Sequence, residues 1–459
     1  MIHRYQKKGL NFVLDVNSGA VHLLDDISYA VSGLLDENMG DTCPQSIVDA
    51  LPDYTADEIR EAYGELYELK KAGQLFAQDD YIDVSRYIPV NAPVKALCLH
   101  VAHDCNLRCQ YCFASTGDFG QGRKIMPPEI AKKAIDFVIA RSGVRHNIEV
   151  DFFGGEPLMA WDTVTQTVDY ARSLEEKYNK KFRFTITTNG LLLDEDKRKY
   201  INENMDNCVL SLDGRREVND EFRKTVAGTG SYDTIVPKFK ALVDERDPNL
   251  DYYARGTFTS HNLDFAEDVL SIADAGFDRL SVEPVTADPG CGYDLTEDDL
   301  PKIEAEYDRL TDIMLERKKE GKPFTFFHFM VDLDQGPCVV KRLRGCGAGY
   351  EYVAVTPDGD IYPCHQFVGK EEFKQGSVLD QSFNMDIAQK FAGMNIYSRP
   401  KCQKCWAKFY CSGGCSAANY NMNHDMNDSY DLGCEMERKR LECAIYLKVM
   451  DKICANQSK

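Results

Sequence analysis

The sequence of 459 residues has no apolar stretch long enough to span a membrane, and its first eight residues lack the hydrophobic core of a signal peptide. Basic residues are few: 54 Lys and Arg stand against 74 Asp and Glu, for a net charge of -20. Such a surface repels the phosphates of nucleic acid. No internal repeat or low-complexity segment stands out. We therefore expect a cytoplasmic protein with neither a membrane nor a nucleic-acid partner.

Cysteine, in contrast, is abundant, with 17 in the chain. A reducing compartment disfavours structural disulfides, so clustered cysteines there indicate metal ligands. Three lie in one short loop, and eight more lie between Cys338 and Cys434. The remaining six are isolated, and we expect no metal role for them: Cys43, Cys98, Cys208, Cys291, Cys443 and Cys454.

The loop reads Cys105-Asn-Leu-Arg-Cys109-Gln-Tyr-Cys112, a C-x3-C-x2-C spacing with Tyr111 before the last cysteine. Three thiolates can hold three irons of a cubic 4Fe–4S cluster and leave the fourth iron open to a small chelating ligand. The alternative is a structural zinc site, but zinc sites usually combine two C-x2-C pairs, and no second pair lies nearby. The loop therefore predicts a 4Fe–4S cluster with one open iron.

This loop resembles the signature of the radical S-adenosylmethionine (SAM) enzymes. In that family the amino and carboxylate groups of SAM bind the open iron, and one electron from the cluster releases a 5′-deoxyadenosyl radical. The stretch Gly154-Gly155-Glu156-Pro157, directly after a predicted strand, resembles the family's GGEP motif, which binds the amino group of SAM. Two glycines let backbone approach a ligand closely, and the Glu156 carboxylate can accept from an ammonium group.

Polar residues also end three further predicted strands, where ligands collect in a parallel barrel. The resemblance places Thr188, Asn189, Ser211 and Asp213 in contact with, or in support of, the ribose and methionine part of SAM, and Arg255 near its carboxylate. Each also fits an ordinary turn or a buried polar network. Arg223 is a further candidate for a contact with substrate or with a carboxylate.

From residue 94 onward, short β-rich runs alternate with amphipathic helical runs, which indicates βαβ units and a parallel sheet. Six such units match the partial (β/α)6 barrel of the radical SAM enzymes, although the alternation by itself also fits a doubly wound sheet. We expect strands over 94–101, 148–153, 182–187, 208–212, 252–259 and 279–285. We expect helices over about 128–141, 161–178, 195–204, 231–245 and 264–275, and a long one over about 297–319.

The first 76 residues read as a separate unit, with a hairpin over 12–24, a helix over about 27–38 and a second helix that begins at the capping box Thr55 to Glu58. This is a winged-helix-like arrangement, but its last helix lacks the basic residues that DNA binding needs. It resembles the recognition domain of enzymes that modify ribosomally made peptides, in which a leader peptide adds a strand to the sheet edge. The alternative is a structural cap on the barrel.

The C-terminal cysteines form the second constellation. Their spacing is C-x12-G-x4-C from Cys346 to Cys364, then C-x2-C-x5-C-x3-C from Cys402 to Cys415, then Cys434. It resembles the seven-cysteine SPASM domain, which carries two auxiliary 4Fe–4S clusters; two zinc sites are the alternative. By that resemblance Cys346, Cys364 and Cys415 serve the first cluster, and Cys402, Cys405, Cys411 and Cys434 serve the second.

Seven cysteines leave the two auxiliary clusters one ligand short. Cys338, seven residues before Cys346, is a candidate for the missing position. Without it the first auxiliary cluster has an open iron to which a substrate thiolate can bind. His365, beside Cys364, fits a hydrogen-bond donor to cluster sulfur better than a ligand.

The prediction is therefore an α/β protein with a winged-helix-like recognition domain (1–76), a linker (77–93), a radical SAM partial barrel (94–285), a helical connection (286–337) and a SPASM domain with a C-terminal helix (338–459). The chain resembles most the maturases of SCIFF peptides (six cysteines in forty-five residues). The resemblance implies SAM, three 4Fe–4S clusters, a Cys-rich precursor peptide and an electron donor such as flavodoxin or ferredoxin.

The activity implied is formation of a thioether between a cysteine sulfur and an α-carbon. This removes two electrons from the peptide, one with the abstracted hydrogen and one that needs an acceptor. A sulfatase-activating enzyme that makes formylglycine shares the barrel and SPASM motifs but not the N-terminal domain. A carbon–carbon crosslinking maturase also fits the motifs, and an iron–sulfur electron carrier or peptide-binding scaffold is the non-catalytic alternative.

Overall fold

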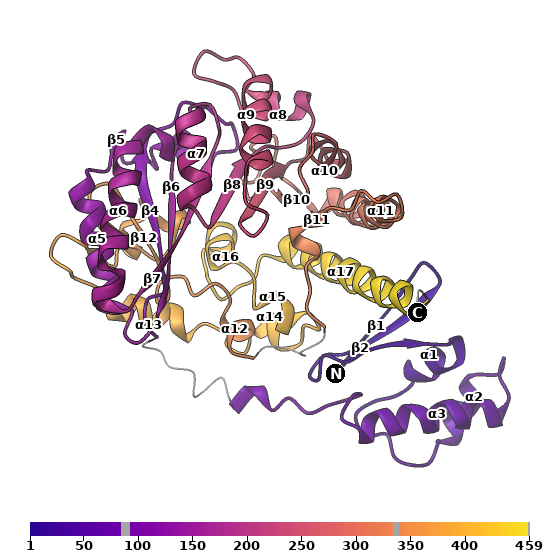
Figure 1. Ribbon diagram of the computed structural model, residues 1–459. Coiled ribbons are helices and arrows are strands. Elements are labelled where there is room, and N and C mark those ends of the chain that lie inside the picture. Colours follow the sequence, from indigo (N-terminus) through magenta and orange to yellow (C-terminus); the bar gives the residue numbers. More distant parts are fainter. Residues whose placement is uncertain (84–91, 334–338, 458–459) are drawn as a thin grey trace.

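One long, mostly parallel sheet organises the chain (Figure 1). The computed structural model describes residues 1–83, 92–333 and 339–457. Its main sheet has the strand order β11-β10-β9-β8-β7-β6-β4-β12-β13-β14, with β5 (Lys124–Ile125) beside β4. The six parallel barrel strands are β4 (Ala96–His103), β6 (Asn147–Gly154), β7 (Lys181–Thr188), β8 (Asn207–Ser211), β9 (Asp251–Phe258) and β10 (Arg279–Pro284).

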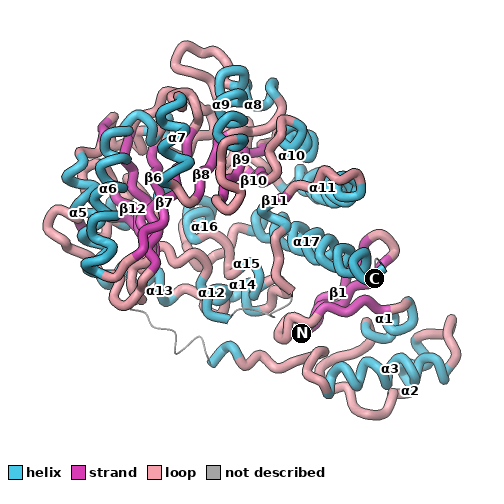
Figure 2. Tube along the Cα trace, in the orientation of Figure 1, coloured by secondary structure: helices cyan, strands magenta, loops and turns pink. Residues whose placement is uncertain are grey.

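Helices follow these strands and cover the outer side of the curved sheet (Figure 2). They are α5 (Pro128–Arg141), α6 (Trp161–Tyr178), α7 (Glu195–Asn204), α8 (Arg216–Phe222), α9 (Tyr232–Asp244), α10 (Phe265–Asp274) and α11 (Leu300–Lys319). The α/β partial barrel expected from the sequence is confirmed, and its strands lie within two residues of their predicted ends. The short helix α8 was not predicted. The part of the chain that the structure describes has no helix long and apolar enough to cross a membrane.

The alternation of side chains along each strand places the core on one side and the functional groups on the other. On β6, Ile148, Val150 and Phe152 are fully buried in the core beneath the helices. Phe153, which points the opposite way, lines the cavity inside the barrel. Pro128 in the first turn of α5 and Asp194 as the N-cap of α7 define where these two helices begin.

The C-terminal cysteine domain is joined to the barrel by its sheet. β12 (Tyr352–Val355) pairs in parallel with β4 and antiparallel with β13 (Asp360–Tyr362), which pairs with β14 (Gly376–Ser377). Gly359, the glycine of the C-x12-G-x4-C spacing, lies in the turn between β12 and β13 and has φ +88°. At the opposite sheet edge lie β11 (Thr325–Phe326) and the 3-10 turn η4 (Phe327–Phe329). The helices of the C-terminal domain are α12 (Val339–Arg344), α13 (Met385–Gly393), α14 (Pro400–Gln403), α15 (Lys408–Cys411), α16 (Ser416–Asn423) and α17 (Asp431–Gln457).

The N-terminal unit is an antiparallel sheet with three helices. It comprises β1 (Ile2–Lys7), β2 (Leu10–Asp15), β3 (Val21–Leu24), α1 (Asp26–Ser32), α2 (Gln45–Ala50) and α3 (Ala56–Lys71), in the strand order β1-β2-β3. The predicted hairpin is present as β2 and β3, and both hydrogen bonds of the Thr55–Glu58 capping box form. The prediction of a helix over 27–38 was too long, because α1 ends at Ser32. β1 was missed because polar residues dominate it.

The N-terminal sheet lies between its own helices and α17. In Figure 1, α17 is to the upper left of this sheet. Tyr5 and Phe12 pack with Tyr446 of α17, whereas Val13 faces the helical side with Ile59. The His3 ring also stacks on Trp406 with 3.8 Å between ring centroids. The unit therefore rests directly on the C-terminal cysteine domain.

Candidate functional site

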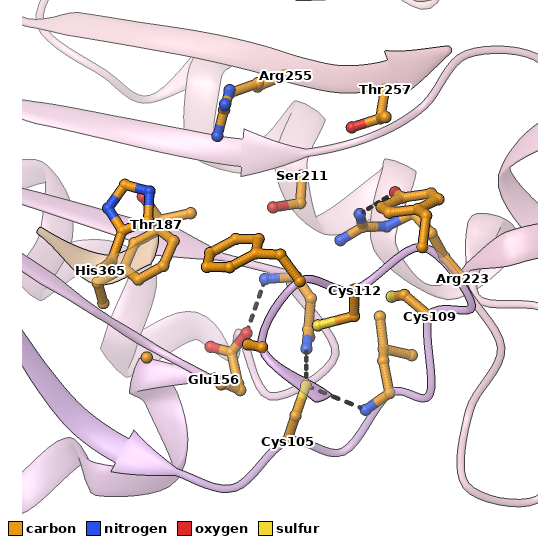
Figure 3. A pocket seen from close by; sticks show the side chains of 18 of the residues that line it. Cys105, Cys109, Cys112, Glu156, Thr187, Ser211, Arg223, Arg255, Thr257 and His365 are labelled. Carbon is orange, nitrogen blue, oxygen red and sulfur yellow. Dashed lines mark hydrogen bonds between the residues drawn. The ribbon is translucent and has the colours of Figure 1, made fainter. Parts of the chain in front are cut away.

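The three-cysteine loop directly follows β4 and borders a cavity of about 230 Å³ at the carboxyl ends of the barrel strands. Cys105, Cys109 and Cys112 all line this cavity, which we call the three-cysteine cavity (Figure 3). Burial, followed by the charge of Glu156, raises the pKa of the Cys105 thiol to about 12. Burial likewise raises the pKa of Cys109 to about 11, against the lowering effect of Arg223. Such buried thiols reach the thiolate form most readily by binding a metal.

The two glycines of the Gly-Gly-Glu-Pro motif pack against the cysteine loop itself. A side chain on Gly154 would collide with the carbonyl oxygen of Ala102, and one on Gly155 with that of Asp104. Because no side chain intervenes, two backbone hydrogen bonds form: the Gly155 N–H donates to Ala102 O at 2.7 Å, and the Glu156 N–H donates to Asp104 O at 2.9 Å. The glycines thus allow two chain segments to approach closely, and this places Glu156 beside the cysteines.

Glu156 is a buried carboxylate, 1% exposed, and within the described residues its hydrogen-bond donors are all neutral groups. The donors are the Leu158 N–H at 3.0 Å, the Thr188 hydroxyl at 2.8 Å and the Asn189 N–H at 2.7 Å. Burial raises its pKa, and these three hydrogen bonds act in the opposite direction. A carboxylate without a cationic partner inside a cavity is suited to bind an ammonium group of a ligand.

Asn189 connects this carboxylate to the cysteine loop. Its side-chain amide donates to Asn106 Oδ1 at 2.8 Å and lies 3.5 Å from Cys105 Sγ. The Leu107 N–H lies 3.4 Å from the same sulfur. N–H groups in such positions stabilise a thiolate and tune the metal bound to it.

Asp213 supports the cavity from behind, because it is 1% exposed and is absent from the cavity wall. It accepts from the Tyr111 hydroxyl at 2.5 Å and from the Thr257 N–H at 3.1 Å. Arg223 donates to the same Tyr111 hydroxyl at 2.8 Å and lies 3.7 Å from Asp213. Arg223 does line the cavity, and its buried Nε has no hydrogen-bond partner among the described residues.

Arg255 lies on the opposite side of the cavity from the cysteines, on β9 next to Thr257 (Figure 3). Its Nε and Nη2 bind the two oxygens of Glu283 on β10 at 3.2 and 2.5 Å. This bidentate pair satisfies much of the charge of Arg255. Arg223, beside Cys109 and with a free Nε, is therefore better placed than Arg255 to meet a carboxylate near the cysteines.

A second chamber of about 530 Å³ continues from the three-cysteine cavity. Tyr111, Cys112, Phe113 and His365 line both chambers. The second chamber extends to residues 421–424 of the C-terminal domain. Together the two chambers offer room for a small cofactor near the cysteines and for a larger molecule beyond it.

The residues fit a cluster and SAM. No three His, Cys, Asp or Glu side chains in the described residues converge as they would around a single metal ion. The cysteines of the loop instead face one cavity, as expected for a cluster that spreads its ligands over several irons. Glu156 suits the amino group of SAM, the orphaned Nε of Arg223 suits its carboxylate, and Ser211 adds a hydroxyl group to the wall.

A separate cavity of about 320 Å³ contains Cys402, Cys405, Cys411 and Cys434, and we call it the four-cysteine cavity. Arg438 Nη1 lies 3.9 Å from Cys405 Sγ, and Ser429 Oγ lies 3.5 Å from Cys402 Sγ. Burial raises the pKa of Cys411 to about 12, with Glu437 adding to the effect. The structure thus brings together the four cysteines that the sequence assigned to one cluster.

Cys346, Cys364 and Cys415 form the third group. Burial raises the pKa of Cys364 to about 12, and the charges of Cys415 and Cys346 add to this. Arg399, 3% exposed, donates to Gly413 O at 2.8 Å and to Ser416 Oγ at 3.0 Å on either side of Cys415. Cys338, the predicted candidate for a further ligand, lies outside the described residues.

Sequence reasoning missed Glu283 and Thr257 as cavity residues. Both occupy the carboxyl halves of barrel strands, which is the signal that would have identified them. The isolated Cys98 and Cys208 are buried, as expected for thiols within strands. The wall of the cavity otherwise contains the predicted Tyr111, Gly154, Gly155, Glu156, Pro157, Thr188, Asn189, Ser211 and Arg255.

Comparison with known proteins agrees with the division of the chain into a barrel and a C-terminal cysteine domain. The profile of the Radical SAM superfamily matches residues 99–251, and that of the SPASM iron–sulfur cluster-binding domain matches residues 346–406. A cysteine-type anaerobic sulfatase-maturating enzyme of Clostridium novyi is 25% identical over 354 residues, which are 72% of this chain and 90% of that protein.

Two solved structures share the fold. The anaerobic sulfatase maturase anSMEcpe with bound AdoMet and the Kp18Cys peptide has a TM-score of 0.64 at 21% identity and covers 78% of this chain and 99% of its own. SuiB of Streptococcus suis bound to its precursor peptide SuiA has a TM-score of 0.53 at 17% identity and covers 93% of this chain and 97% of its own. The chain therefore carries a radical SAM domain joined to a SPASM iron–sulfur cluster-binding domain.

Proposed function

We propose that this protein is a peptide maturase that joins a cysteine sulfur to an α-carbon in a ribosomally made Cys-rich peptide. The observation that carries the proposal is the N-terminal three-stranded unit docked on the SPASM domain, which adds a peptide-sized binding surface to a radical SAM cavity. SuiB, whose structure was solved with a precursor peptide, matches 93% of this chain, whereas the sulfatase maturase matches 78%.

Within this proposal, one 4Fe–4S cluster is held by Cys105, Cys109 and Cys112, and SAM lies against it. Two auxiliary clusters are held by the two groups of SPASM cysteines. Bound there, SAM supplies the hydrogen-abstracting chemistry of its family and the clusters supply and accept electrons. Glu156 holds the amino group of SAM and Arg223 holds its carboxylate. Asn189 donates to Cys105 and keeps its sulfur anionic.

The second chamber is the proposed position of the peptide. It begins at Cys112 and Phe113 beside the SAM position and extends toward the SPASM domain. Forming the sulfur–carbon bond removes one hydrogen atom from the α-carbon, one proton from the thiol and one further electron. The SPASM cysteines would hold clusters that could accept this electron, with a ferredoxin or flavodoxin as the electron partner.

The N-terminal unit is the proposed site of the leader peptide. β3 pairs with β2 on one side, and no strand of the described residues pairs with its other edge. The exposed Leu23 on β3 and Leu34 after α1 provide apolar contacts near that edge. Such an edge accepts an extended peptide through main-chain hydrogen bonds.

Formylglycine formation is the second candidate. It is favoured by the similarity to anSMEcpe, which extends over 99% of that chain. The two activities differ in product: a thioether consumes one thiol and one α-hydrogen, whereas formylglycine formation converts a single cysteine side chain to an aldehyde.

The test is an anaerobic incubation of the reconstituted enzyme with SAM, a reductant and the small Cys-rich peptide encoded beside its gene, followed by sequencing of the product by mass spectrometry. Thioether formation predicts loss of two hydrogens, one cysteine that no longer alkylates and a fragmentation break at the acceptor α-carbon. A control peptide without the leader should react poorly. An aldehyde-containing product from a sulfatase-derived cysteine peptide, with no reaction of the Cys-rich peptide, would favour the second candidate instead.

A further inference from the structure

A row of charged and polar side chains runs from the three-cysteine cavity to the four-cysteine cavity. Arg255 and Glu283 line the first cavity, and Glu437 lines the second. His328 and Arg440 lie between them. Arg255 and Glu283 lie on the barrel strands β9 and β10, whereas Glu437 and Arg440 lie on α17, so the row connects the wall of the barrel to the C-terminal helix.

The row begins with a cation that faces the cavity. Arg255 is 45% accessible although protein surrounds it, because its accessible surface lies in the cavity that it lines. Glu283 engages Nε and Nη2, and Nη1 has no hydrogen-bond partner among the described residues. Glu283 therefore orients the guanidinium plane and leaves one edge for a bound molecule.

His328 lies next to Glu283 and is not one of the residues that line the three-cysteine cavity. Its Nε2 lies 3.1 Å from Ser281 Oγ and 3.8 Å from Glu283 Oε1. Its Nδ1 lies 3.3 Å from Arg440 Nη1. Because a guanidinium can only donate, Nδ1 must be the acceptor, and the ring carries its proton on Nε2, toward Ser281 and Glu283.

Arg440 belongs to α17, the C-terminal helix of the SPASM domain, and its side chain is only 14% exposed. Its other nitrogen, Nη2, pairs with Glu437 one turn earlier. Burial, followed by Arg440, lowers the pKa of His328 to about 3, although Glu283 acts in the opposite direction. The ring is therefore neutral at physiological pH, and its Nε2–H faces Ser281 Oγ, with Glu283 Oε1 3.8 Å from the same nitrogen.

We propose that Arg440 is a positioning residue that acts through His328 and Glu283 to aim the free edge of Arg255 at the backbone carbonyl of the bound peptide. The proposal rests on the proposed function of a peptide maturase. The reacting part of the peptide must reach from the second chamber into the three-cysteine cavity, and we assign Arg255 to that part because Arg255 lies across the cavity from the cysteines, whereas Arg223 lies beside them (Figure 3). A C-terminal helix would then determine how the substrate lies in the barrel.

The test replaces Arg440 by Met, which keeps a long apolar stem and removes the charge. Lys448→Met, about two turns further along the same helix, is the matched control. The clusters of both variants are reconstituted. The measurements are thermal unfolding, iron content, SAM cleavage without peptide, and the KM and kcat for the peptide. We expect Arg440→Met to raise the peptide KM about tenfold, with peptide-independent SAM cleavage within twofold of wild type. Arg440→Lys should recover part of the loss.

A purely structural role predicts a different result. An unchanged peptide KM in a folded, iron-loaded Arg440→Met enzyme would overturn the proposal, and so would a loss of SAM cleavage without peptide, because Arg440 would then act on the SAM side. If Arg440→Met fails to fold, His328→Phe provides the same test, since it removes both hydrogen bonds of the ring. In the double variant the two effects should not add, because both interrupt one row.

The pH profile provides a second readout. Arg440 from α17, Arg255 from β9 and Glu283 from β10 are the charged groups that face His328. Burial, the first cause of the lowered pKa of the ring, remains when Arg440 is replaced, so the ring of Arg440→Met should stay neutral above pH 6. The peptide KM of Arg440→Met should therefore exceed that of wild type by the same factor from pH 7.5 to 6, and an excess that appears only at low pH would contradict a positioning role. Absence of SAM cleavage in the wild-type enzyme would refute the proposed function, whereas a wild-type enzyme that modifies the peptide, together with an unchanged peptide KM in Arg440→Met, would refute only the role of Arg440.

Discussion

The three-cysteine and four-cysteine cavities contain the same ligand chemistry in opposite electrostatic settings. In the four-cysteine cavity, charged side chains are paired with opposite charges: Lys408 with Asp79, Arg438 with Glu435, and Lys401 with Asp431. In the three-cysteine cavity Arg255 is paired with Glu283 and Arg223 lies 3.7 Å from Asp213. Among the described residues, however, the Glu156 carboxylate accepts hydrogen bonds from neutral donors alone, and the Nε of Arg223 has no partner.

This difference distinguishes a site that takes a small molecule from one that holds a complete cluster. A fourth cysteine completes the ligands of a cubic cluster, whereas three cysteines leave one iron for an exchangeable ligand. Charge left unpaired inside a protein is costly, so its retention next to three cysteines indicates a charged ligand. The number of cysteines and the pairing of the nearby charges thus indicate the same assignment: the three-cysteine cavity binds a small molecule, and the four-cysteine cavity holds a fully ligated cluster.

The largest effect should follow removal of a cysteine from either cavity. Cys109→Ala should abolish SAM cleavage, by a factor of about 1000 or more, because the cluster that contacts SAM cannot assemble. Cys411→Ala should leave peptide-independent SAM cleavage within about threefold while abolishing peptide crosslinking. Each should lose about four of roughly twelve irons if all three clusters are present. Equal loss of SAM cleavage in both variants would mean that the cavities are not separate in function.

Glu156→Gln tests the unpaired carboxylate. The amide removes the negative charge that binds the SAM ammonium, and loss of a charged hydrogen bond costs about 1.5–3 kcal/mol, or roughly 10- to 100-fold in SAM affinity. The measurement is the SAM-dependent change in the electron paramagnetic resonance spectrum of the reduced cluster. Glu149→Gln on the same strand, which is exposed, is the control and should bind SAM normally. Unchanged SAM affinity in Glu156→Gln would remove the carboxylate from the site.

Arg438→Met tests the electrostatic setting of the four-cysteine cavity. Its guanidinium lies 3.9 Å from Cys405 Sγ and stabilises added negative charge on a cluster there. We expect the reduction potential of the second auxiliary cluster to fall by on the order of 50 mV, which is about tenfold in the one-electron equilibrium. Redox titration followed by electron paramagnetic resonance checks this. The cluster held by Cys105 should keep its potential, and a shift there would contradict the separation.

The smallest effect concerns the contact between the four-cysteine cavity and the N-terminal segment. Asp79 accepts from the buried Lys408 at 2.6 Å and from the Tyr397 hydroxyl at 2.5 Å. Asp79→Asn leaves Lys408 without its counter-ion and should cost about 1–2 kcal/mol, reduced because Asp79 is partly solvated. Thermal unfolding should fall by a few degrees, whereas Asp80→Asn should not change it. SAM binding should be unaffected in both.

Much of the barrel and most of the first site were predictable from the sequence. The barrel strands alternate with helices at a regular period, and caps such as Asp194 mark helix ends locally. The cysteine loop and the Glu156 motif are contiguous, so spacing alone identified them. The same holds for Cys402, Cys405 and Cys411, which occupy one short segment and share a cavity.

The features that could not be predicted from the sequence depend on contacts between segments that are distant in the chain. Asp213 was expected either to contact SAM or to support its site. The side chain lies behind Tyr111 and Arg223, in a supporting position that only the packing of the chain after β8 against the loop reveals. The pairing of Arg255 with Glu283 joins two strands, and no local pattern reports it. β1 was missed because its outward residues are polar, and its partner surface on α17 lies more than 400 residues away.

The pairing of β12 with β4 has a consequence for how such proteins can be recombined. Four residues of β12 pair in register with β4, from Tyr352 opposite Ala96 to Val355 opposite Leu99, and β4 leads directly into the Cys105 loop. Two modules recognised by separate profiles are thus parts of one covalent and hydrogen-bonded scaffold. A chimera that imports a SPASM domain from another enzyme must also import a compatible edge for β4. Evolution of new products in this architecture should accordingly proceed by changes in loops and cavity walls more readily than by exchange of whole domains.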